Sequence, residues 1–184
     1  SRTDHAQYKT NLASANWILP LMLLSGAVSF FYEVLWTRLL SHLIGGSIHA
    51  FAVMLASFLA GIALGGGLGA WLARSRDRAV MAFIAAQVAV ALAAAAAYGV
   101  LLGLAPYNGG LADNSWTGFL LLLPMTIEIG TTFPLAVRIL APSPPAAAAA
   151  SARVYAWNTV GAIVGAIAGG FWLIPLLRYE GSVR

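Results

Sequence analysis

Cysteine is absent from the 184 residues, and charged residues are scarce, at 9%. The lack of cysteine excludes disulfides, thiolate chemistry and cysteine-ligated metal sites within this sequence. The charged fraction is far below the roughly 25% of an ordinary soluble domain. Hydrophobic residues make up 60% of the chain, and the mean hydropathy is +0.83. These values predict an integral membrane protein.

Long apolar runs recur along the chain, and none shows the alternation typical of strands. A helix of about 20 residues crosses a hydrocarbon layer of about 30 Å. We therefore predict an all-α membrane protein, a bundle of about five transmembrane helices. The expected spans are residues 17–44, 48–73, 79–104, 116–140 and 154–177.

Two short segments flank the transmembrane helical domain, residues 17–177. Residues 1–16 form a polar N-terminal segment. Residues 178–184 form a tail that we expect to continue into a further segment.

The basic residues indicate the orientation of the spans. The net charge is +4, but Lys and Arg are scattered between the apolar runs, which argues against a nucleic-acid partner. Arg and Lys in short loops mark the cytoplasmic side. An N-terminus inside the cell places seven of the ten basic residues there. We predict a multi-pass protein of the bacterial inner membrane with a cytoplasmic N-terminus and with Asp113 in an outward loop.

Two spans carry glycines at four-residue spacing, which gives each helix a smooth stripe for close packing against a neighbour. The stripes are Gly61, Gly65 and Gly69 on the second span and Gly161, Gly165 and Gly169 on the fifth. We interpret both stripes as helix-packing surfaces.

The spans also suggest an incomplete 3+3 inverted repeat. The first and fourth spans each hold one central Glu followed by an Arg, and the second and fifth hold the glycine stripes. The first and fourth spans run in opposite directions, as the halves of an inverted repeat do. The sixth helix of such a repeat has no counterpart before Arg184.

Glu33 and Glu128 are expected at similar depth near the membrane midplane. A charge there costs roughly 2.5 to 3.5 kcal/mol on insertion scales, so both carboxyls should face the bundle interior. Arg38 lies about 140° around the helix from Glu33 and cannot pair with it on one face. We hypothesise instead that Arg38 links the first and fourth spans. A structural role and a role in binding a cation, a proton or a polar solute both remain open.

The other polar residues give no recognisable catalytic or metal site. Arg138 ends the fourth span, and Asn158 is expected to form an interhelical hydrogen bond. His42 and His49 lack partners with metal-binding spacing. No Ser/His/Asp arrangement or phosphate-binding loop is present, so no cofactor or metal is expected in this chain.

Several stretches resemble one protein family. YEVLWTRLLSHLIGGSIHAFAVMLASFLAGIALGGGLGAWLA, TTFPLAVRIL and ARVYAWNTVGAIVGAIAGGFWLIPLL resemble the membrane region of bacterial spermidine synthase-like proteins, in which transmembrane helices are fused to an aminopropyltransferase-type domain. The matching positions are Tyr32, Glu33, Trp36, Arg38, Pro134, Arg138, Tyr155 and Asn158. The glycine run before ARSRDR is similar, more weakly, to major facilitator transporters.

The resemblance implies a membrane module attached to a domain that uses decarboxylated S-adenosylmethionine and a polyamine. That domain and its catalytic residues are absent from this chain, so whether the protein is an enzyme stays open. We expect a module that anchors or assists such a domain. The alternatives are a non-enzymatic helical subunit of a larger membrane complex, and half of a small-solute or polyamine transporter. The expected partners are the lipid bilayer and other transmembrane helices or subunits.

Overall fold

The computed structural model describes residues 15–44, 47–104, 111–141 and 143–173. The long helices are α2 (Ile18–Ile44), α3 (Ser47–Leu72), α4 (Arg76–Leu104), α5 (Leu111–Leu140) and α6 (Ala147–Ile167). A short 3-10 helix, η1 (Pro144–Ala146), precedes α6, and a π-helical turn, η2 (Ala168–Leu173), continues it. Five helices are long and apolar enough to cross a membrane, so the expected multi-pass helical bundle is confirmed in these ranges.

The first three spans begin and end within three residues of the expected positions, and the last two begin earlier than expected. Helix α5 starts at Leu111, so Asp113 lies inside a helix and not in a loop. Helix α6 starts at Ala147, before the expected span 154–177, because the Ala-rich stretch that precedes this span consists of the strongest helix formers. Pro144 and Pro145 fit the first turn of η1, where the missing N–H groups have no helical partner in any case. Residues 1–14 and 174–184, which include most of the N-terminal segment and the whole tail, lie outside the described residues.

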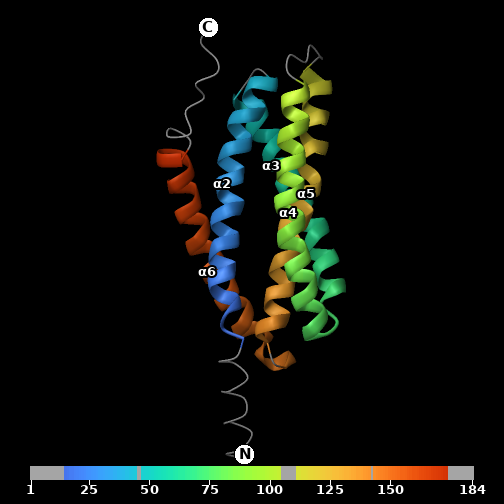
Figure 1. The fold of residues 1–184 in the computed structure, drawn as a ribbon. Helices are drawn as coiled ribbons and strands as arrows, with labels where there is room; N and C mark the ends of the chain where they lie inside the picture. The colour runs from blue at the N-terminus through green and yellow to red at the C-terminus, as the bar shows by residue number, and fades with distance from the viewer. Residues whose placement is uncertain (1–14, 45–46, 105–110, 142, 174–184) are drawn as a thin grey trace, which may run out of the picture.

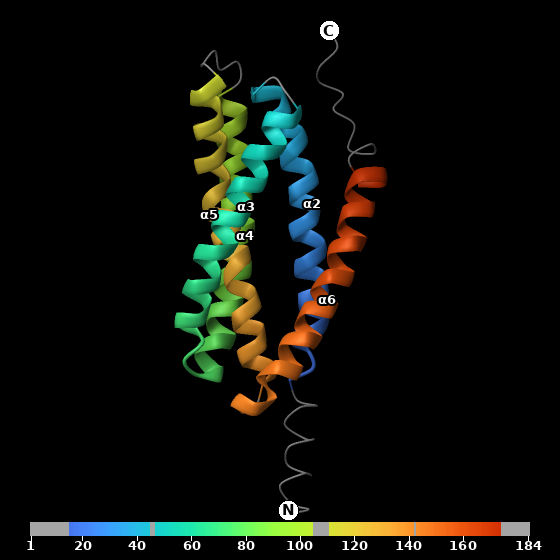
Figure 2. The ribbon, with the colours of Figure 1, turned by 180° about the vertical axis from the view of Figure 1, so that it is seen from behind.

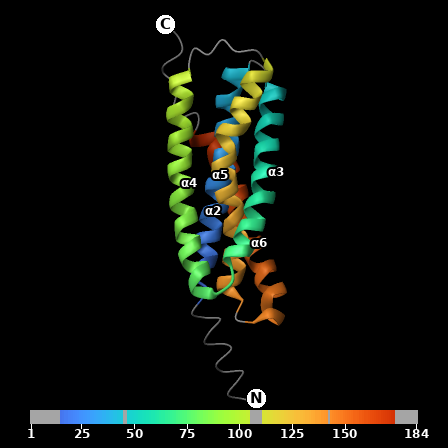
Figure 3. The same cartoon turned by 90° about the vertical axis from the view of Figure 1, so that its right-hand side faces the viewer.

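The helices form an elongated bundle (Figures 1 and 2). Helix α3 packs most extensively on α5, α6 packs on α2, and α4 packs on α5. Figure 3 shows α5 with α4 on one side and α3 on the other.

The core divides into two clusters along the bundle axis. One cluster joins the start of α2 and α4 to the end of α5 and the start of α6, around Met22, Phe83 and Leu135. The second joins the end of α2 and α4 to the start of α3 and α5, around Trp36 and Met125. Both clusters therefore depend on α2 and α5, which are the two central helices of the bundle.

Candidate functional site

The glycine stripe of α3 lies directly against α5. A Cβ at Gly65 would overlap the backbone carbonyl of Ile127, and one at Gly69 would lie 2.6 Å from the carbonyl oxygen of Thr131. Gly61 lies in the same way against Thr126. Contacts this close leave no room for a side chain, so the three glycines let the two backbones approach each other.

The stripe of α6 lies against α2 in the same manner. Gly165 meets the carbonyl of Ala27, and Gly169 meets Phe31. Gly161 meets the carbonyl of Leu23. The structure therefore places all six predicted packing glycines at helix contacts.

The two glycine contacts are related by a constant sequence offset. Gly65 and Ile127 have counterparts in Gly165 and Ala27, each 100 residues away along the chain. The pair Gly69 and Thr131 corresponds in the same way to Gly169 and Phe31. Helix α3 thus corresponds to α6, and helix α5 corresponds to α2. An inverted repeat produces this relationship.

The 100-residue offset supports the predicted repeat through the glycine contacts and not through the two Glu residues. Arg38 and Arg138 are 100 residues apart and are equivalent, but Glu33 corresponds to Phe133 and Glu128 corresponds to Val28. The two carboxylates, which suggested the repeat, are therefore not equivalent positions.

Hydroxyl groups form hydrogen bonds between α3 and α5 beside the glycine stripe. The Ser57 hydroxyl, fully buried, donates within α3 to the Val53 carbonyl at 2.9 Å and lies 3.2 Å from the Phe119 carbonyl of α5. In return, Thr126 Oγ1 of α5 donates to the Ser57 carbonyl at 3.0 Å. Reasoning from the sequence missed this pair. The position of Ser57 one turn before Gly61, on the same face, is the signal that could have revealed it.

Glu33 and Glu128 are both half-buried, with buried and exposed residues one turn away on each helix. Trp36 and Leu40, one and two turns from Glu33, are almost fully buried, as is Met125 one turn before Glu128. Thr37 and Thr131 donate to the backbone carbonyls of Glu33 and Glu128 at 2.8 and 2.7 Å. The carboxyl groups themselves form no ion pair within the described residues. Beside Glu33, the Trp36 indole N–H is buried and has no acceptor in the same ranges.

The contact between Leu40 and Gly118 fixes the relative depth of the two carboxylates. Glu33 lies seven residues from Leu40 and Glu128 lies ten from Gly118, both toward the same end of the bundle. A rise of about 1.5 Å per residue places them about 4.5 Å apart in depth, which agrees with the expectation of similar depth.

The hypothesised link from Arg38 to the fourth span does not form in the structure. Arg38 is exposed and has no ion-pair partner among the described residues. By the same register it lies about 12 Å from Glu128 along the axis, which is beyond the reach of its side chain. The physical reason is this separation along the axis, together with the exposed position of Arg38 on α2.

Basic residues gather at the end of the bundle where α2 begins. The turn between α3 and α4, the end of α5 and the start of α6 all lie at this end (Figures 1 and 2). They carry Arg74, Arg76, Arg78, Arg138 and Arg153. Arg153 donates to the Asn16 side-chain oxygen at 3.0 Å, and the Arg74 guanidinium stacks 4.9 Å from the Trp71 ring. Arg138 is half-buried in the last turn of α5, where a cation complements the helix dipole.

Asn158 lies at the crossing of α6 and α2. Its backbone carbonyl lies against Gly26, and its side-chain oxygen is 3.0 Å from the position of a Gly26 Cβ. Its side chain forms no interhelical hydrogen bond within the described ranges, so the expected bond is not observed. The His42 side chain lies outside the described part, and no group of three or more His, Cys, Asp or Glu side chains gathers elsewhere in it.

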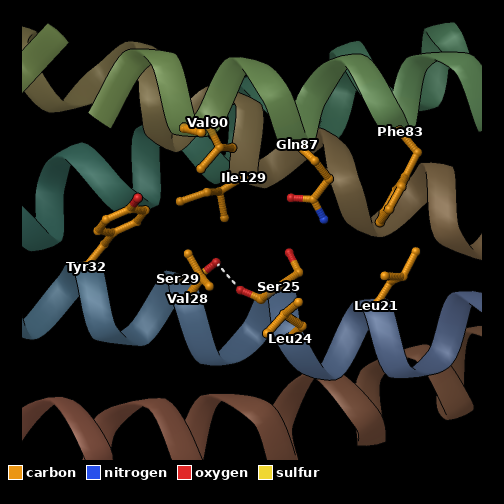
Figure 4. A pocket seen from close by; sticks show the side chains of 11 residues that line it. Leu21, Leu24, Ser25, Val28, Ser29, Tyr32, Phe83, Gln87, Val90 and Ile129 are labelled. Carbon is orange, nitrogen blue, oxygen red and sulfur yellow. Dashed lines mark hydrogen bonds between the residues drawn. The ribbon is translucent and has the colours of Figure 1, made fainter. Parts of the chain in front are cut away.

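A groove of about 410 Å³ lies between α2 and α4, with Ile129 of α5 at its base. Figure 4 shows the side chains of the two helices pointing toward each other across this space. Most of the lining is apolar, and Leu24 is 58% exposed. The polar lining residues are Ser25, Ser29, Tyr32 and Gln87. We call this the α2–α4 groove; the sequence did not reveal it because it depends on how α4 is placed relative to α2.

Comparisons with protein-family models, with curated proteins and with solved structures found no match to this chain.

Proposed function

We propose that this chain is the membrane-embedded helical module of a spermidine synthase-like protein, which anchors or assists an aminopropyltransferase-type domain outside the 184 residues. The family resemblance of residues 17–177 suggests the ancestry. The observation that carries the structural part of the proposal is the close glycine packing of α3 on α5 and α6 on α2. A bundle joined at two such contacts is suited to hold an attached domain in a fixed position.

The use of the intramembrane polar groups also supports an anchoring role. The hydroxyls of Ser29, Thr37 and Thr132 donate to carbonyls of their own helices. Thr126 and Ser57 join two helices. Polar side chains that bond to backbone in this way stabilise a bundle and are not available to line a passage for a solute.

The proposal also includes the orientation of the bundle in the membrane. The basic end of the bundle faces the cytoplasm by the positive-inside rule, in the inner membrane of a bacterium. The attached domain would then meet the cytoplasmic pool of polyamine and decarboxylated S-adenosylmethionine. Arg138, Arg153 and the α3–α4 turn would lie on the side of that domain.

The test begins with the native polypeptide in its own membrane. Its intact mass should exceed 19.2 kDa by the mass of a soluble domain. Washed membranes should transfer an aminopropyl group from decarboxylated S-adenosylmethionine to a polyamine, and membranes from a deletion strain should not. A native mass near 19.2 kDa, or membranes without this activity, would refute the proposal.

A second candidate is a non-enzymatic helical subunit of a larger membrane complex. The exposed, partly polar α2–α4 groove within the bundle favours it, because such a surface suits contact with another transmembrane helix. A native mass near 19.2 kDa together with co-purification in a stoichiometric complex would support this candidate over the first.

Half of a transporter is the remaining candidate, and it makes a different prediction. Uptake of a polyamine into vesicles should then depend on the half-buried carboxyl of Glu33. Loss of uptake in Glu33→Gln, with normal amounts of folded protein, would favour transport over anchoring.

A further inference from the structure

A second groove, of about 370 Å³, lies at the basic end of the bundle, where the ends of α3 and α5 meet the start of α6 (Figure 2). Its volume is within the range of about 300 to 1,000 Å³ that is usual for small-molecule sites. We call it the interfacial groove. Its polar side is formed by Arg138, Ser143 and Ser151, and its apolar side includes Ala70, Phe133 and Val137.

The three polar side chains of the interfacial groove have no partners in the part of the chain that the structure describes. Arg138 is half-buried, and its guanidinium forms no ion pair or hydrogen bond there. Ser143 is the N-cap residue of η1, but its hydroxyl does not cap that helix. The Ser151 hydroxyl also forms no hydrogen bond within these ranges. The N–H donors of Arg138 are therefore available to a ligand, together with two hydroxyls.

The charges around Arg138 favour an anion. None of the described residues that line the groove is acidic. Asp77 lies at the same end of the bundle, but it lines a different hollow. Four further cations lie at this end, namely Arg74, Arg76, Arg78 and Arg153. A guanidinium binds phosphate oxygens through paired hydrogen bonds, and serine hydroxyls donate to the same oxygens. The polar side is therefore suited to a phosphate group.

The apolar side of the groove favours a lipid over a free phosphate ion. Phe133 lies five residues before Arg138, which is about 7.5 Å deeper along α5. Phe133, Val137 and Ala70 all belong to the stretches of α5 and α3 that are long and apolar enough to cross a membrane. A free phosphate would leave this apolar surface uncovered, whereas a phospholipid would cover it with an acyl chain. Basic pockets between transmembrane helices bind anionic lipid headgroups in this way.

We propose that the interfacial groove binds one anionic phospholipid, with its phosphate on Arg138, Ser143 and Ser151 and an acyl chain along Ala70 and Phe133. A headgroup with a net negative charge is preferred, because the ammonium group of a zwitterionic lipid would lie among the arginines of this end. The bound lipid would contact α3, α5 and α6 together. This inference goes beyond the proposed function and requires only that α5 crosses a membrane.

The experiment measures lipid binding by the full native polypeptide, purified in detergent and freed of lipid. Native mass spectrometry follows its titration with phosphatidylglycerol and, separately, with phosphatidylcholine, and gives the Kd of the first bound lipid. The test variant is Arg138→Gln. The matched control is Arg76→Gln, which removes the same charge at the same end but does not line the groove. A second variant, Ser151→Ala, places the better helix former in α6, so the fold should be kept.

One phosphatidylglycerol should bind more tightly than phosphatidylcholine. Its Kd should rise about tenfold or more in Arg138→Gln, through the loss of charge-assisted hydrogen bonds, and about two- to tenfold in Ser151→Ala. The Kd should be nearly unchanged in Arg76→Gln. Equal Kd values for the two lipids, equal effects of the two arginine variants, or displacement of the lipid by inorganic phosphate at the same concentration would each overturn the proposal. An unchanged Kd in Ser151→Ala would overturn it even where Arg138→Gln does not fold.

Photo-crosslinking in native membranes tests where the lipid binds. A photoreactive amino acid in place of Ala70 should capture anionic phospholipid in excess over the other lipids of the membrane. The control position is Leu68, which is 40% exposed on α3 and does not line the groove. The same mixture of lipids at both positions, or capture of a polypeptide at position 70, would overturn the proposal.

Discussion

Gly65 lies against the backbone carbonyl of Ile127, in the same way that Gly165 lies against that of Ala27. The sequence positions differ by 100 in both helices of the pair, so one contact is the counterpart of the other. The close approach of α3 to α5 and of α6 to α2 therefore has a single structural basis, and the central predictions concern these contacts.

Gly65→Ala should destabilise the bundle by about 1 to 3 kcal/mol, because the new methyl group would overlap the Ile127 carbonyl. The control is Gly66→Ala, whose added Cβ would meet nothing within 4 Å. That variant should be neutral or slightly more stable because Ala is the better helix former. Thermal unfolding in detergent measures both; equal Tm values for the two variants would contradict the packing described for α3.

Thr126→Val should weaken the contact between α3 and α5 through the loss of the hydrogen bond to Ser57. Interhelical hydrogen bonds in membranes contribute about 0.6 kcal/mol on average. Thr132→Val is the matched control, because the Thr132 hydroxyl is buried too but donates within α5, to Ile129. Unfolding free energies should fall for the first variant and change less for the second. The reverse order would show that Thr126 does not join the helices.

Glu128→Gln should leave the stability unchanged or raise it. The carboxyl group has no ion-pair partner within the described residues, and an amide removes the cost of placing a charge near the midplane. Unfolding in detergent and the yield of folded protein measure the effect. A loss of more than about 2 kcal/mol, as expected when one partner of a buried pair is removed, would point to an unrecognised cation.

Single cysteines can test the orientation, because the chain has none of its own. Ser75→Cys at the α3–α4 turn should react with a membrane-impermeant maleimide only after the membrane is permeabilised. Ile48→Cys, at the other end of α3 and 80% exposed in the native residue, should react in intact spheroplasts. The opposite labelling pattern would reverse the proposed topology.

The sequence was sufficient to predict the helices and the glycine contacts, because apolar length and small-residue spacing are local properties. Glu33 and Glu128 suggested the inverted repeat through a wrong correspondence, since the 100-residue offset of the glycine contacts aligns Glu33 with Phe133. The Arg38 link failed because a sequence gives the angle of a side chain on its own helix but not which helix that angle faces. The pairing of Ser57 with Thr126 and the α2–α4 groove depend on contacts between distant segments, which no local pattern encodes.

The most direct test of the inverted-repeat packing is disulfide trapping between paired cysteines. Gly169→Cys with Phe31→Cys should crosslink, because a Cβ at position 169 would lie 3.6 Å from the Cα of Phe31. The counterpart pair, Gly69→Cys with Thr131→Cys, should crosslink as well. The exchanged pairs, Gly169→Cys with Thr131→Cys and Gly69→Cys with Phe31→Cys, are predicted to stay reduced under the same mild oxidation. Crosslinking of the exchanged pairs, with none in the first two, would contradict the account.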